Sequence, residues 1–402
     1  MNEPIILAGG IIFIPLAIYI FLGPSMHLRV GALMVLMLSG VLGIVGVPGL
    51  LVLLVLAFIA RDANSILETW PIGKLWWCVT TAGLLMALDP SEYSVSVGAG
   101  IATAVYLSTA IRNGGIYIVA WGGFAGSLVF ALRNLSSPVI TVADSINGNV
   151  SMIGRRILPD LDPNATAAIL LLGILFGVAV LLQARGFLVF IILVGIACIV
   201  TSIILIAARY AIVAAAISVA AFWLLSRSFS RVSLIGAIAL VSGAVVLPTI
   251  GEVQSFARFA KLSGDTDSRT AIYAHWWNLI YDEGLLLGIP AAVIDAQSVA
   301  PHNAILEALA HFGLIGLIGL SITAWFVALP FTKGGWEMRI PALSILGLAM
   351  IVGLIAQYTP WLALVLLNAQ QFSGEWRAGI PGKELGQGTG SEGVGSLRGS
   401  RR

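Results

Sequence analysis

The sequence predicts an all-α polytopic membrane protein with about twelve transmembrane helices and one long external loop that carries the functional site. Of the 402 residues, 59% are hydrophobic and only 10% are charged, and the mean hydropathy is +1.01. These values lie far from those of soluble domains. Apolar stretches of about 20 residues, the length that crosses a bilayer as a helix, recur from end to end. The weaker alternating pattern typical of membrane β-barrels does not appear.

The expected helices are separated by short polar segments or by proline and glycine. They lie near 5–22, 28–60, 71–88, 93–111, 114–132, 165–183, 186–206, 209–226, 232–250, 304–329, 338–356 and 358–371. The stretch 28–60 has two interpretations, because Gly46-Val47-Pro48-Gly49 either kinks one long tilted helix or separates two short ones. The first apolar segment has no basic residues before it and no clear cleavage site after it, which favours a retained span over a signal peptide.

Residues 1–371 are expected to form one integral membrane domain. The Gly/Ser-rich tail, 372–402, is predicted to be disordered because its composition cannot build a core. Basic residues in short connections set the orientation, since they favour the cytoplasmic side. Those that share one side are Arg61, Lys74, Arg112, Arg185, Arg227, Arg231, Lys333 and Arg339. The long loops 133–164 and 251–303 then lie on the opposite, external side.

Arg209 lies between two apolar spans on the external side, against this charge bias. One interpretation is an arginine that extends to the interface. The other is a functional residue, because ionisable groups at membrane depth are costly and commonly serve a function.

Arg269 opens a segment in which Tyr273, Trp276 and Trp277 follow at helical spacing. An interfacial helix with an aromatic belt and one solvated charge accounts for this pattern. The functional alternative is that the guanidinium of Arg269 grips a phosphate or diphosphate while the aromatic rings contact a sugar or a polyprenyl chain.

His302 immediately precedes an expected span, and Asn303 is placed to cap that helix. Capping explains Asn303 but not His302, whose imidazole would lie at the positive end of the helix, where a neutral ring can accept a proton. His275 and His311 are interpreted as packing residues. Gly313, Gly316 and Gly319 recur at every third position and predict a smooth face for close helix packing.

Other classes of site have little support. No His/Cys cluster has metal-ligand spacing, and Asp265 with Asp267 is a weak signal that solvation of a loop explains as well. No phosphate-binding loop or dinucleotide fingerprint indicates a cofactor, and a net charge of +2 does not indicate a nucleic-acid partner. Cys78 and Cys198 lie in separate apolar spans, which favours small core residues over a disulfide.

Four motifs between about 160 and 320 together resemble the O-antigen ligase/polymerase family of bacterial inner-membrane glycosyltransferases. They are Asp162-Pro163-Asn164 before a span, Thr201 with Ala208-Arg209-Tyr210, the pair Ser268-Arg269, and His302-Asn303 followed by Gly313-x-x-Gly316. The sequence departs from the family pattern at Ala208 and Tyr210, which flank Arg209, and at Gly288-Ile289-Pro290, where Gly-x-Gly is expected.

The resemblance implies a metal-independent C-type glycosyltransferase in the bacterial inner membrane, with its site on the periplasmic face. It would move a glycan from an undecaprenyl-diphosphate carrier to a hydroxyl acceptor such as lipid A-core or another glycan, without a cofactor. Carried over by position, Arg209 and Arg269 would engage the diphosphate and His302 would activate the acceptor. The expected substrate-binding residues are Tyr273, Trp276, Trp277 and Asn303. A repeat-unit polymerase and a protein O-oligosaccharyltransferase remain alternatives, and a secondary transporter or flippase is the non-enzymatic one.

Overall fold

In the computed structural model, the described part of the chain is helical and contains no β-strand. It comprises residues 25–39, 48–137, 163–181, 184–206, 214, 265–297, 300–301, 303–328, 342–343, 346–347 and 358–367. The expected spans near 5–22, 209–226, 232–250 and 338–356 lie wholly or mostly outside these residues, as does the tail 372–402.

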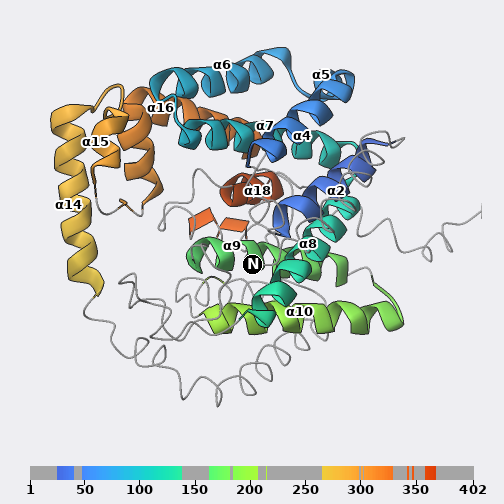
Figure 1. Cartoon of the computed structure of the whole chain (residues 1–402). Helices are drawn as coiled ribbons and strands as arrows, with labels where there is room; N and C mark the ends of the chain where they lie inside the picture. The colour runs from blue at the N-terminus through green and yellow to red at the C-terminus, as the bar shows by residue number, and fades with distance from the viewer. Residues whose placement is uncertain are drawn as a thin grey trace, which may run out of the picture.

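The helices are shown in Figure 1. Their bounds are α2 Met26–Leu38, α4 Pro48–Arg61, α5 Ala63–Thr69, α6 Ile72–Leu88, α7 Glu92–Arg112, α8 Ile116–Ser136, α9 Pro163–Leu181, α10 Phe187–Ile206, α14 Asp265–Glu283, α15 Ala291–Asp295, α16 Ala304–Ala328 and α18 Tyr358–Leu367. Six of them, α6 to α10 and α16, begin and end within a few residues of the expected spans. Pro163 is the first residue of α9, a position where its missing N–H costs no hydrogen bond.

Within the described residues, four helices are long and apolar enough to cross a membrane: α7, α8, α10 and α16. A fifth span is possible if α5 and α6 are counted together, although these two helices meet at an angle of 117°. Pro71 lies at this bend and precedes the first residue of α6, where proline cannot continue the preceding helix. The fold therefore defines a multi-pass helical membrane protein, while the count of twelve spans remains a prediction.

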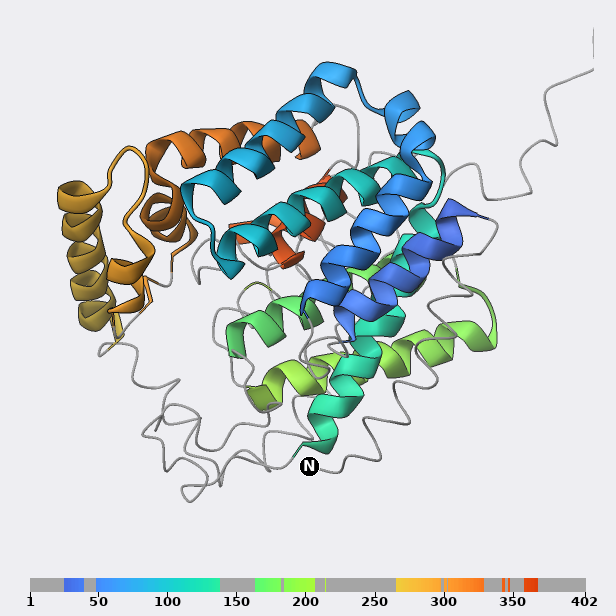
Figure 2. The same cartoon turned by 45° about the horizontal axis from the view of Figure 1, so that its top comes forward.

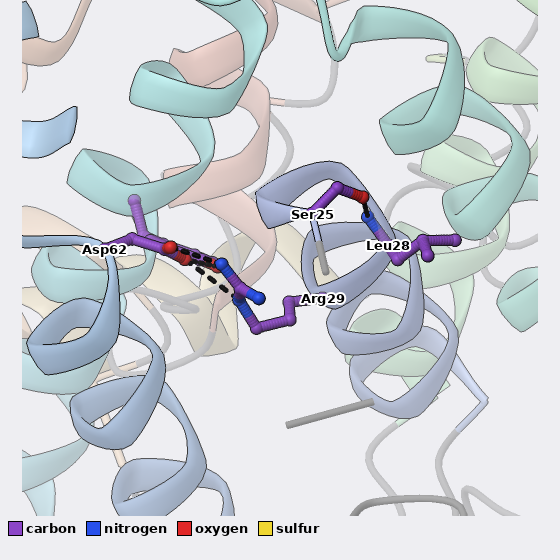
Figure 3. Close-up of polar contacts among 5 residues, drawn as sticks. Ser25, Leu28, Arg29 and Asp62 are labelled. Atoms are coloured by element: carbon purple, nitrogen blue, oxygen red, sulfur yellow. Dashed lines mark hydrogen bonds and ion pairs between the residues drawn. The ribbon is translucent and has the colours of Figure 1, made fainter. Parts of the chain in front are cut away.

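The stretch 28–60 forms two helices, α2 and α4, rather than one kinked helix. The guanidinium of Arg29, near the start of α2, forms an ion pair with the carboxylate of Asp62, which directly follows α4 (Figure 3). Arg29 Nε donates to Asp62 Oδ2 at 3.1 Å, and the hydroxyl of Tyr106 on α7 donates to the same oxygen at 2.7 Å. Because the start of one helix meets the end of the other, α2 and α4 run antiparallel.

Close packing around α8 holds the centre of the bundle. A Cβ atom on Gly122 of α8 would overlap the backbone of Gly31 on α2, so the two helices approach more closely there than any larger residue permits. Phe124 of α8 packs against α9 and α10 in the same way, over Gly177 and Gly195. All the described side chains of α9 are buried, as expected for a helix that is apolar around its whole circumference.

The two ends of the bundle differ in their charged residues. Arg29 and Asp62 lie at one end with Arg112, whose Nη1 donates to the carbonyl oxygen of Thr69 at 3.3 Å. The ammonium of Lys74 lies 5.6 Å from the ring centroid of Phe326 near the end of α16. Arg61, Lys74 and Arg112 thus lie at one end of the described bundle, while the cytoplasmic orientation of that end remains a prediction. The opposite end, called the Asp89 end below, carries the turn between α6 and α7.

Helix α14 lies at the Asp89 end beside α16, and its axis runs across those of α6 and α10 (Figures 1 and 2). It packs through Trp276 and Ile280 against Leu306, Leu309 and Ala310 of α16, forming a small core separate from that of the bundle. Part of the segment expected as a polar loop, 251–303, is therefore an ordered helix docked on the bundle.

Candidate functional site

Helix α16 is broken at Gly313, close to the Asp89 end. Gly313 has φ 62° and ψ −168°, a backbone conformation that residues with a side chain rarely adopt. The break divides the helix into 304–312 and 314–328. Gly316 and Gly319 lie beyond the break and pack on Leu85 and Thr81 of α6, as the predicted smooth face requires. Gly313 also packs closely, but on the backbone of Leu286 and Leu287 and not on a neighbouring helix, and it interrupts α16 where a continuous smooth helix face was predicted.

The segment 284–289, which follows α14, fills this break with its backbone. The N–H of Leu314 donates to the carbonyl oxygen of Leu285 at 2.9 Å, and the N–H of Ile289 donates to the carbonyl oxygen of Ala310 at 2.7 Å. Gly288 has φ 94°, and a Cβ atom there would overlap the backbone of His311. The segment thus supplies hydrogen-bond partners for backbone groups of α16 on both sides of the break, where an unpaired buried group would be costly.

A cluster of polar side chains lies beside the break. His311 Nδ1 is 2.7 Å from Asp89 Oδ2, and the imidazole stacks on the ring of Tyr93 with centroids 3.8 Å apart and planes 8° from parallel. The Tyr93 hydroxyl donates to Glu307 Oε2 at 3.2 Å, and the Ser91 hydroxyl donates to Asp89 Oδ2 at 2.7 Å. Asp89 and Glu307 are both buried.

This arrangement fixes both the position and the chemistry of His311. A carboxylate accepts hydrogen bonds, so contact with Asp89 favours a proton on Nδ1 and leaves Nε2 as the basic nitrogen when the ring is neutral. Glu307 and His311 lie one turn apart on the same helix; His311 contacts Asp89 in the turn between α6 and α7, and Glu307 contacts Tyr93 in the first turn of α7. The cluster therefore ties the first segment of α16 to the α6–α7 turn, 222 residues away in sequence.

Asn303 caps α16 as predicted. Its Oδ1 accepts from the N–H groups of Ile305 at 3.0 Å and Leu306 at 3.2 Å, and its carbonyl oxygen accepts from the N–H of Glu307 at 2.8 Å. His302 lies outside the described residues, between buried Pro301 and this cap. The predicted roles of His302 in catalysis and of Asn303 in substrate binding remain predictions.

The two tryptophans of α14 have different surroundings. Trp276 is buried and packs on α16, whereas half of the Trp277 surface is exposed. Tyr273 is half-buried at the edge of the same small core, and exposed His275 lies 2.9 Å from Gln297 Oε1 through its Nε2. These positions give Trp276 a packing role, while Tyr273 and Trp277 keep surface on which a substrate can bind.

The two predicted arginines are only partly located. Arg269 lies in the second turn of α14, and its side chain is outside the described structure. Arg209 also lies outside it, three residues beyond the end of α10. Helix α10 ends on the same side of the bundle as α14 (Figures 1 and 2). Helix α14, which contains Arg269, and the end of α10, the last described helix before Arg209, thus lie on one side of the bundle.

Sequence reasoning missed Asp89 and Tyr93 and took His311 only as a packing residue. The available signal was an aspartate in the short turn Asp89-Pro90 between two expected spans, but an aspartate there is equally typical of a residue that caps the next helix. No group of three or more potential metal-ligating side chains occurs in the described ranges. Metal independence stays a prediction.

The fold and this cluster define a multi-pass helical membrane protein with an ordered polar site at one end of its bundle. Comparisons with family models, curated proteins and solved structures gave no match to this chain. The resemblance to O-antigen ligases therefore depends on the sequence motifs alone.

Proposed function

We propose that this protein transfers a glycan from an undecaprenyl-diphosphate carrier to a hydroxyl acceptor at the outer face of the bacterial inner membrane. The observation that carries the proposal is the docking of α14 on α16. The helix that includes Arg269 and Tyr273 packs on the helix segment that begins directly after His302 and Asn303. This docking supports the proposal, because Arg269 and Tyr273 belong to a helix that contacts the segment following His302 and Asn303.

The chemistry requires charge stabilisation at the leaving group. As the acceptor oxygen bonds to the anomeric carbon, the bond from that carbon to the diphosphate breaks and its electron pair moves to a phosphate oxygen. Arg209 and Arg269 would stabilise this developing charge. Their electrostatic attraction to it is larger in a site of low dielectric constant than in water. His302 would take the proton that the acceptor hydroxyl loses.

The polar cluster and the broken helix suit this role. Buried Asp89 and Glu307 anchor the first segment of α16, and the loop 284–289 holds the same segment from the other side. A catalytic group at the start of this segment gains a fixed position from both contacts, and fixed geometry is a large part of catalysis.

The test uses purified protein in vesicles with an undecaprenyl-diphosphate-linked glycan, and offers lipid A-core, free glycan and a hydroxyl-bearing peptide in turn as acceptor. Transfer to one of them identifies a ligase, a polymerase or a protein glycosyltransferase. Arg269→Ala is expected to lower the rate roughly a hundredfold, equivalent to about 3 kcal/mol. Arg269→Lys should be intermediate, because lysine keeps the charge but not the planar fork.

Arg185→Ala is the matched control, since Arg185 is an exposed arginine in the connection before α10 at the opposite end of that helix. Equal rates for Arg269→Ala and Arg185→Ala would contradict the assigned role. Movement of the labelled carrier across the vesicle membrane without any glycan transfer would favour the flippase alternative.

A further inference from the structure

An apolar surface runs along one flank of α14 and into the turn that follows it. Trp277 is 50% exposed and Tyr281 66%, while Leu286 and Leu287 in the turn are 62% and 58% exposed. Trp277 and Tyr281 lie one helical turn apart and therefore share a flank. Large apolar residues gathered on a surface in this way mark an interaction site. We call these four residues the α14 apolar flank.

The other exposed flank of α14 is polar. Asn278 and Asp282 are exposed there and also lie one turn apart, and His275 contacts Gln297 beside them. The exposed half of the helix is thus divided lengthwise into an aromatic strip and a polar strip. A helix that only faced water would have no need for this division, whereas a helix at the boundary between lipid and water requires it.

The α14 apolar flank is continuous with the lipid-facing surface of a membrane span. The carbonyl oxygen of Leu286 accepts from the N–H of Ile315 at 3.3 Å. Ile315 and Ile318 are 42% and 57% exposed on α16, a helix apolar and long enough to cross the bilayer. Lipid that covers these two isoleucines therefore lies directly beside Leu286.

We propose that α14 lies in the plane of the membrane surface and inserts Trp277, Tyr281, Leu286 and Leu287 into the interfacial layer of the bilayer. Tryptophan and tyrosine favour this layer because their rings are apolar and their N–H and O–H groups reach water. The axis of α14 runs across those of α6 and α10 in both views (Figures 1 and 2). The polar strip, with Asn278 and Asp282, faces water.

This surface role is independent of glycan transfer. It does have a consequence for the proposed function, because an in-plane α14 holds its whole length, the turn with Arg269 included, near the depth of the lipid phosphates. The diphosphate of a lipid-linked donor would lie at the same depth.

Depth measurement by spin labelling tests the proposal. In a background of Cys78→Ala and Cys198→Ala, single cysteines at Trp277, Tyr281, Leu286 and Leu287 are labelled with a nitroxide. The protein is placed in vesicles of phosphatidylethanolamine and phosphatidylglycerol. Collision rates are measured with oxygen, which concentrates in the bilayer, and with a water-soluble nickel chelate. The ratio of oxygen to nickel collisions should be several-fold higher at these positions than at the matched controls Asn278→Cys and Asp282→Cys.

Equal ratios on the two flanks of α14 would overturn the proposal. Labels at Tyr281 and Leu286 that neither reagent reaches would overturn it as well, because protein and not lipid would then cover the flank. If Trp277→Cys does not give folded protein, the collision ratios are compared at Leu286→Cys and Leu287→Cys instead. These residues lie in a turn and their side chains are mostly exposed, so their substitution should not prevent folding.

Discussion

The backbone N–H of Leu314 donates a hydrogen bond at 2.9 Å to the carbonyl oxygen of Leu285, a residue of another segment. This bond shows how α16 remains stable while it is broken at Gly313. In the interior of a membrane protein an unpaired backbone group is expensive, so a break persists only where another segment supplies the missing partners. Segment 284–289 supplies them and thereby joins α14 to α16.

The first prediction concerns the glycines of this junction. Gly313→Ala and Gly288→Ala should each lower stability by about 2 kcal/mol or more, because a side chain is disfavoured at positive φ and would also overlap neighbouring backbone. Thermal unfolding in detergent measures the effect. Gly83→Ala is the control, since Gly83 lies within α6 with open space around it, and alanine there should be neutral or stabilising. Equal melting temperatures for Gly83→Ala and Gly313→Ala would contradict the role of the break.

The second prediction concerns the buried ion pair of Arg29 and Asp62. Asp62→Leu should destabilise the protein by about 3–5 kcal/mol, because it leaves a buried guanidinium without its carboxylate. The double variant Arg29→Met with Asp62→Leu should recover much of this loss, since no buried charge then remains. Additive effects of the two single variants in thermal unfolding would show that the pair is not coupled.

The third prediction compares His311 with His275, both of which are interpreted from the sequence as packing residues. His311→Ala should destabilise the protein by about 3 kcal/mol, because it removes the partner of buried Asp89 and the ring stacked on Tyr93. His275→Ala should change stability by less than about 0.5 kcal/mol, since His275 is exposed. A His275 variant as unstable as the His311 variant would show that the cluster at Asp89 is not the stabilising feature.

The fourth prediction tests His302 as the group that activates the acceptor. His302→Gln keeps hydrogen-bonding capacity but cannot take a proton near neutral pH, so turnover should fall by about 10²–10⁴ while donor binding is retained. Asn303→Asp is a useful companion, because aspartate also caps helices and should leave folding intact. Wild-type turnover in His302→Gln would reduce His302 to a positioning role.

The fifth prediction is metal independence. Transfer by the purified protein should be unchanged by chelators, because the proposed charge stabilisation comes from guanidinium groups. Loss of turnover in EDTA with recovery in Mg²⁺ or Mn²⁺ would instead point to carboxylates such as Asp265 and Asp267 as metal ligands.

The sequence alone determined the class of protein and the approximate bounds of six of the twelve described helices. Burial in lipid depends on local composition, so an apolar stretch such as 187–206 indicates a helix whatever its neighbours are. The Asn303 cap was equally readable, because a cap and the N–H groups it satisfies lie within three residues of one another.

Tertiary structure alone decided the contacts between distant segments. The reversal between α2 and α4 follows from the pairing of Arg29 with Asp62, and the role of His311 follows from Asp89. The break at Gly313 depends on segment 284–289, because a glycine in an apolar helix fits close packing as well as it fits a break. Local sequence does not distinguish these outcomes, since their free energies are set by the partner that the fold brings to each residue.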